Sequence, residues 1–163
     1  MTNPPIQRHR SLQPFSRDHY NGLAQARHLV LSADQEPTQR RTALQRFVRC
    51  WLEEIAGHFT DEERLLLPLI PNERDADRLR REHMVLRELA DAAKERQFDE
   101  PIDPAWLRHL GRTLHDHIRW EERELFGAIE RAATERSLRA LEQETAIIEA
   151  KRDRAGACAL RNE

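Results

Sequence analysis

The stretch HFTDEERLLL, residues 58–67, returns later in the chain as HIRWEERELF, residues 117–126. Five of the ten positions are identical: the histidine, the Glu-Glu-Arg run and one leucine. In both copies the histidine stands four residues before the first glutamate, so in a helix the two side chains lie one turn apart on one face. The chain therefore pairs an imidazole with a carboxylate twice.

The repeat extends into the residues that precede each copy. Apolar residues stand at the same offsets ahead of both histidines: Phe47, Val48, Trp51 and Ile55 in the first copy, and Trp106, Leu107, Leu110 and Leu114 in the second. This helical periodicity predicts that both pairs face an apolar interior. A second match, Arg17-Asp18-His19 with Arg81-Glu82-His83, indicates two related helical hairpins. Each would supply a lone histidine from its first helix and a His-x-x-x-Glu from its second.

The remaining pattern predicts an all-α fold. Glycine is scarce and prolines fall between the periodic segments, which is typical of long helices without a sheet. We expect one helix to open at Ser16 as its N-cap, and others to span about 38–66, 75–96 and 104–132. These four would form an up-down four-helix bundle over residues 15–132. Residues 1–14 are expected to be an extended arm.

A further segment follows the predicted bundle. Leu138, Leu141 and Ile148 predict an additional short C-terminal helix, which could cap the bundle or form a homodimer contact. Within residues 133–163, the last dozen are expected to be a disordered tail. A chain of 163 residues needs no second domain beyond this.

Bulk composition excludes several kinds of partner. The net charge of -2 argues against nucleic acid and against an anionic membrane surface.

No apolar run is long enough for a membrane span, and the N-terminus lacks the hydrophobic segment of a signal peptide. Two cysteines make neither a disulfide framework nor a zinc knuckle. We therefore expect a cytoplasmic protein.

The inward-facing polar residues point to metal. Imidazoles and carboxylates buried in one small bundle cost free energy unless they are paired or coordinated, and a pair of metal ions would satisfy all of them. The candidate ligands are His19, His58, Glu62, His83, His117 and Glu121. Imidazole together with carboxylate suits iron, manganese or zinc. With Glu62 and Glu121 as bridges, each ion takes two histidines and keeps room for a bridging oxygen and an open position.

Each residue also has a plainer interpretation. A lone helix histidine is more often hydrogen-bonded than a ligand, and a single His-x-x-x-Glu is commonly a surface ion pair. The joint pattern favours metal, because one such residue or pair occurs in each helix and the whole is doubled. His9, His28, His109 and His115 face other directions or lie in the arm, and we expect none of them to be ligands.

Three further acids and one arginine lie near the predicted ligands. Glu54, one turn before His58, is expected to accept a hydrogen bond from a ligand histidine, with a seventh ligand as the alternative. Glu63 and Glu122 are turned by about 100° from the ligand carboxylates, and we expect them to pair with arginines on the helix flanks. Arg87 either bends out to an acid such as Asp91 or donates hydrogen bonds to a bound small ligand.

The ordered motifs resemble the hemerythrin-like, His-His-Glu cation-binding family. The resemblance rests on SRDH at 16–19, HF-x-x-EE at 58–63, EH at 82–83 and H-x-x-x-EE at 117–122, and it spans about residues 9–130. It implies an up-down four-helix bundle around a non-haem di-iron centre, bridged by carboxylates and an oxo or hydroxo group. By this resemblance, His19 and His58 hold one iron, and His83 and His117 hold the other.

The sequence departs from the oxygen-carrying members of that family. Those place a second histidine one turn after the third-helix histidine, where this chain has Arg87, and they end the fourth-helix motif in Asp at a longer spacing, where this chain has Glu121. Fewer protein ligands leave the irons more open. We therefore expect a protein that binds or senses O2, peroxide or nitric oxide, with slow peroxide turnover as an accompanying activity, rather than a dedicated enzyme or oxygen carrier.

Ferritin-like oxidases use Glu-x-x-His on two helices, and the sequence contains no such motif. The alternative that stays open is a zinc-containing or metal-free helical bundle that acts as a structural or regulatory interaction module.

Overall fold

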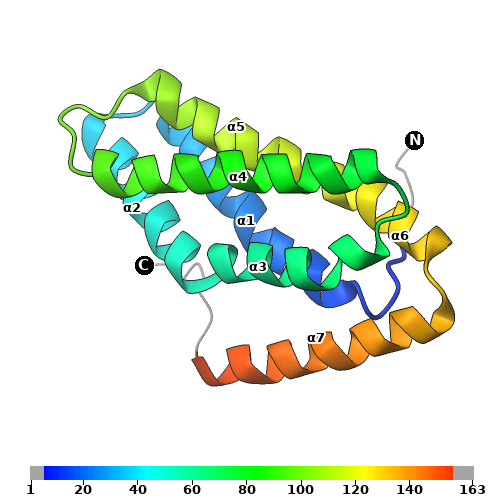
Figure 1. Ribbon diagram of the computed structural model, residues 1–163. Helices are drawn as coiled ribbons and strands as arrows, with labels where there is room; N and C mark the ends of the chain where they lie inside the picture. The colour runs from blue at the N-terminus through cyan, green and yellow to red at the C-terminus, as the bar shows by residue number, and fades with distance from the viewer. Residues whose placement is uncertain (1–5, 156–163) are drawn as a thin grey trace.

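The computed structural model describes residues 6–155, and every regular element in that range is helical (Figure 1). In chain order the elements are α1 (Gln13–Ser32), α2 (Pro37–Cys50), the π-helical turn η1 (Trp51–Ile55), α3 (Ala56–Leu65), the 3-10 turn η2 (Leu67–Leu69), α4 (Glu73–Arg96), α5 (Pro104–Trp120), the π-helical turn η3 (Glu121–Leu125), α6 (Phe126–Ala132) and α7 (Glu135–Ala155). The expected all-α fold class is therefore confirmed. No helix in the described range has the length and apolar character needed to cross a membrane.

The helices begin and end close to the predicted positions. Pro37 and Pro104 stand in the first turns of α2 and α5, where a proline costs no hydrogen bond. Asn72 caps α4, because its side chain accepts a hydrogen bond from the backbone N–H of Asp75. The first helix starts at Gln13 instead of Ser16, so Ser16 is not its N-cap, and Pro14 occupies the first turn.

The additional C-terminal helix is present as α7 and, at 21 residues, is longer than predicted. Its buried residues include Leu138 and Leu141, as the apolar pattern indicated. The predicted disordered tail begins inside this helix, and the rest of it, residues 156–163, lies outside the described residues.

Two π-helical turns interrupt the helices that carry the repeat, and the sequence pattern did not predict them. The chain runs without a break from α2 through η1 into α3, and from α5 through η3 into α6. A π turn holds one extra residue, so it changes which residues face inward on either side of it. η1 ends three residues before His58, whereas η3 begins at Glu121. The two halves of the repeat are therefore related in sequence but not identical in backbone.

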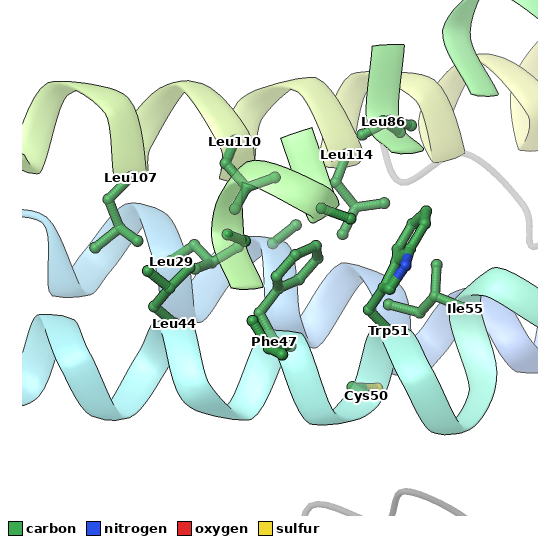
Figure 2. Close-up of a cluster of buried hydrophobic side chains, with 14 of the residues drawn as sticks. Leu29, Leu44, Phe47, Cys50, Trp51, Ile55, Leu86, Leu107, Leu110 and Leu114 are labelled. Atoms are coloured by element: carbon green, nitrogen blue, oxygen red, sulfur yellow. The ribbon is translucent and has the colours of Figure 1, made fainter. Parts of the chain in front are cut away.

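The interior consists of two apolar clusters. One is built around Phe47, Trp51, Leu110 and Leu114, which Figure 2 shows converging from α2, η1 and α5. The other gathers apolar side chains at the opposite end: Leu12, Phe15, Leu66, Leu79, Trp120, Leu125, Phe126, Ile129 and Leu141. Two of the predicted metal ligands contact both clusters: His58 lies against Phe59 of the first and Phe15 of the second, and His117 against Phe59 and Trp120. The six polar side chains therefore lie between two apolar layers.

Helices α1 and α5 approach each other closely at two glycines. A Cβ atom on Gly22 would lie 2.7 Å from Cδ1 of Ile118, and one on Gly111 would lie 2.7 Å from the backbone oxygen of Ala26. Residue numbers along the two helices run in opposite directions at these contacts, so α1 and α5 are antiparallel. Because Gly22 follows His19 by less than one turn, the same close approach holds His19 against the interior.

Candidate metal centre

All six predicted ligands lie in one buried group. They come from α1 (His19), α3 (His58 and Glu62), α4 (His83), α5 (His117) and η3 (Glu121). No side chain among them is more than about a twentieth exposed, and Glu62 and Glu121 are fully buried. The four remaining histidines, which the sequence set aside, belong to neither group of candidate metal-ligand atoms found among the described residues.

Glu62 directs its two oxygens to different histidines. Its Oε1 lies 2.9 Å from Nε2 of His58 and 3.4 Å from Nε2 of His19. Its Oε2 lies 3.3 Å from Nε2 of His83. The carboxylate thus spans the space between the two pairs of histidines.

Glu121 spans the same space from the other side. Its Oε2 lies 3.1 Å from Nε2 of His19, whereas its Oε1 lies 3.3 Å from Nε2 of His117 and 3.8 Å from Nε2 of His83. Each carboxylate therefore offers one oxygen towards His19 and the other towards His83. This is the arrangement that two neighbouring cations would need from bridging carboxylates.

The donor atoms fit cations better than they fit one another. In the described part of the chain, the Nε2 atoms of all four histidines and all four oxygens of Glu62 and Glu121 are buried without a partner in hydrogen-bonding geometry. Leaving one buried polar atom unsatisfied costs about 1–3 kcal/mol, so eight in one place indicate a missing partner. The atoms fall into two groups, each within 4.8 Å: His19, His58 and Glu62, and Glu62, His83, His117 and Glu121. Two cations sharing Glu62 would satisfy both groups.

The other ring nitrogen of each histidine donates to a carboxylate. Nδ1 of His19 lies 2.7 Å from Glu122, and Nδ1 of His58 lies 3.1 Å from Asp18. In the other half of the repeat, Nδ1 of His83 lies 2.9 Å from Glu63, and Nδ1 of His117 lies 2.8 Å from Glu82. A carboxylate on Nδ1 selects the tautomer that leaves the Nε2 lone pair free, as metal-ligating histidines require.

The family model of the hemerythrin HHE cation-binding domain matches residues 15–129. The chain belongs to this family. No curated protein and no solved structure shows significant similarity to it. The buried His/Glu group, whose atoms could hold metal ions, lies inside the matched range, and the domain is described as cation-binding.

The second glutamate of each Glu-Glu pair has a role beyond the expected one. Glu63 and Glu122 of this hemerythrin domain each contact an arginine, as expected from the sequence. Each also accepts the Nδ1–H of a predicted ligand histidine on another helix, which the sequence reasoning missed. The sequence repeat could have indicated this role, because Glu63 and Glu122 occupy matching positions in it, as do Asp18 and Glu82.

Glu54 is hydrogen-bonded to an asparagine, and Arg87 meets an acid, as expected. Glu54 accepts a hydrogen bond from Asn21 at 3.0 Å, and the acceptor on Nδ1 of His58 is Asp18. Arg87 does meet an acid, but the acid is Glu63, at 2.7 Å, and not Asp91. Asp91 instead accepts from Lys94. Arg87 is thus linked to His83 through Glu63.

Without a metal, the charges of the group balance internally. Burial lowers the pKa of His58, but Glu62 and Asp18 outweigh this effect and raise the pKa to about 9. Burial likewise lowers the pKa of His117, and Glu121 and Glu82 raise it to about 9. Burial raises the pKa of Glu62, yet the surrounding histidines bring it well below its ordinary value. In the metal-free protein, protonated imidazoles therefore provide the positive charge that metal cations would otherwise provide.

A small cavity adjoins one pair of histidines in the hemerythrin domain. It has a volume of about 20 Å³ and is lined in part by His19, His58, Gly22, Ile55 and Ile118. That is room for about one water-sized molecule. Glu54 also lines this cavity, which places its carboxylate on the His19 and His58 side of the centre.

Proposed function

We propose that the chain binds two iron ions in this centre and uses them to bind or sense O2, peroxide or nitric oxide. His19 and His58 would hold one ion, His83 and His117 the other, and Glu62 and Glu121 would be shared. The observation that carries the proposal is the convergence of eight buried donor atoms, none with a hydrogen-bonding partner in the described range. We also propose that the four helical segments within residues 15–132 form the up-down bundle expected from the sequence.

The donor set supports iron. Imidazole and carboxylate ligands together suit iron and manganese, and also zinc, whereas a calcium or magnesium site would be built from oxygen atoms. Facing helices of a helical protein are an established setting for paired carboxylate-bridged metals. When bound, iron would supply redox chemistry and open coordination positions for small ligands.

The chain's own residues would hold the site rigid and dry. Asp18, Glu63, Glu82 and Glu122 orient the four imidazoles through Nδ1, so that each Nε2 stays directed at the centre. Apolar layers on both sides exclude bulk water. The small cavity beside His19 and His58 would place a small ligand next to this pair of histidines.

Binding with sensing or reaction is favoured over reversible carriage. No imidazole stands at position 87, and Arg87 is engaged with Glu63 on the flank of the centre. The ion beside His83 would therefore have only two histidines, which leaves it more open than in an oxygen carrier. Slow peroxide turnover would accompany such openness.

We further propose a cytoplasmic location. We also propose a homodimer through α7, for which the exposed Ile147 is the residue to examine first.

Anaerobic loading with ferrous iron tests the proposal. We expect about two irons per chain, followed by separate optical changes when O2, hydrogen peroxide and nitric oxide are added. A protein that retains zinc or no metal under these conditions, and that shows no optical response to any of the three, would overturn the proposal. That result would favour the alternative of a structural or regulatory module.

A further inference from the structure

The two segments that lie outside the hemerythrin match both reach the metal centre. We propose that residues 6–12 and α7 brace one half of it, with Arg8 and Arg152 as positioning residues for His19 and His58. The inference rests on the proposed two-metal site, and it adds that the site of this chain is incomplete in its matched domain alone.

Arg8 reaches His19 by two routes. Its Nη2 lies 3.1 Å from Oε2 of Glu122, the carboxylate that accepts the Nδ1–H of His19. Its guanidinium also lies over the ring of Phe126, 5.3 Å from the centroid, and that ring stacks on His19. The Arg8 side chain is only 6% exposed, so both contacts are shielded from solvent.

Arg152 reaches His58 by a parallel route. It donates to Asp18, the carboxylate that accepts the Nδ1–H of His58, and it lies 3.3 Å from Asp61 on α3. The bracing of His58 thus depends on a helix that begins after the matched range ends.

α7 is held differently along its length. Leu138, Leu141 and Thr145 bury its first half against the rest of the molecule. From Glu144 onwards, ion pairs connect α7 to the flanks of α1 and α3, namely Arg64 with Glu144, Arg17 with Glu149, and Arg152 with Asp18 and Asp61. These pairs are partly exposed, so salt screens them. Figure 1 shows α7 running along the outside of α3.

The other half of the centre is braced from within the matched domain. Glu63, which orients His83, contacts Arg87 at 2.7 Å, and Glu82, which orients His117, contacts Arg78 at 2.6 Å. Both arginines belong to α4. Each of the four ligand histidines is therefore bonded to a carboxylate that in turn contacts an arginine. Two of these four arginines come from outside residues 15–129.

This asymmetry predicts separable effects on the two metals. Losing Arg8 or Arg152 frees the carboxylate to turn away, and the histidine behind it loses its fixed orientation. Removing the group that orients a ligand histidine typically costs 10–100-fold in metal affinity, so an arginine one step further out should cost about tenfold. The loss should fall on the metal held by His19 and His58.

The test uses the full chain and competitive cobalt(II) titration against a chelator, which reports both affinities and the visible spectrum of each bound ion. We expect Arg8→Met and Arg152→Met each to reduce the affinity for one and the same ion about tenfold, and the double variant to reduce the affinity for that ion alone. Arg78→Met and Arg87→Met should reduce the affinity for the other ion. Combining Arg152→Met with Arg87→Met should therefore weaken both, and Arg152→Lys should restore part of the affinity.

If Arg152→Met and Arg87→Met weaken the binding of the same ion, or if Arg8→Met and Arg152→Met weaken the binding of different ions, the inference is wrong. If the unaltered chain binds fewer than two ions, the proposed function itself fails before any variant is compared.

Discussion

Glu62 and Glu121 face one another across the centre with all four carboxylate oxygens buried and without a hydrogen-bond partner in the described range. Each raises the cost of ionising the other, because like charges repel strongly in a buried site. Such a pair is tolerated only with several positive charges close by. Protonated histidines supply them in the metal-free protein, and metal cations would supply them more completely.

Neutralising one bridge should disrupt the two-metal site. We expect Glu62→Gln and Glu121→Gln to reduce bound iron from two to one or fewer per chain, since each carboxylate serves both pairs of histidines. Metal analysis after anaerobic loading measures this. Glu124→Gln, which alters an exposed residue of the same turn as Glu121, is the matched control. Two irons retained in either bridge variant would contradict the assignment.

The metal-free protein should lose stability as the pH rises. The pKa values of His58 and His117 are raised to about 9, by nearby carboxylates that outweigh burial. A raised pKa contributes stability that is fully present below the unfolded value of about 6.5 and is lost as the pH passes through the folded value. Thermal unfolding of metal-free protein should therefore show a falling Tm between about pH 6.5 and 9.

Metal binding should show the opposite pH dependence in the same interval. The histidines must release their protons before they can bind a cation, so affinity should rise with pH up to about 9. Proton release on adding zinc at neutral pH, followed with an indicator dye, checks this directly. A metal-free Tm that stays constant across the interval, together with no proton release, would show that the histidines are already neutral.

The close approach of α1 and α5 can be tested with a pair of glycines. A Cβ on Gly111 would lie 2.7 Å from the backbone oxygen of Ala26 and 2.8 Å from Cγ2 of Val30, so the helices must separate. We expect Gly111→Ala to lower the free energy of unfolding by about 1–3 kcal/mol in urea denaturation. Gly57 has no atom within 4 Å of its added Cβ, so Gly57→Ala should raise it by up to about 1 kcal/mol. Equal effects at both positions would be inconsistent with this packing.

Arg87 should affect reactivity more than metal content. Its contact with Glu63 acts on His83 from outside the centre, so at saturating iron Arg87→Ala is expected to keep two irons per chain while changing the rate of the optical response to peroxide. Lys94→Ala removes an ion pair with Asp91 on the same helix and serves as the control. Peroxide kinetics identical to those of the unaltered chain would remove any role of Arg87 in reactivity.

Much of the helical layout could be predicted because its causes are local. Pro37, Pro104 and the apolar periodicity marked the helices, and a His-x-x-x-Glu places two side chains on one face whatever the rest of the chain does. The local sequence pattern did not predict features for which two backbone conformations have similar local energy. The start of α1 at Gln13 and the π turns η1 and η3 are such cases, since packing selects them.

The sequence by itself determined which six side chains share one interior, because their spacing and their repetition are properties of single helices. Only the tertiary structure decided which helix each outer carboxylate serves. Asp18 is adjacent to His19 but orients His58, and Glu122 is adjacent to Glu121 but orients His19. Such partners depend on how the helices rotate and pack against one another. For the same reason no local pattern marked Arg8 or Arg152. Arg8 lies more than 100 positions along the chain from Glu122, and Arg152 lies more than 100 positions from Asp18.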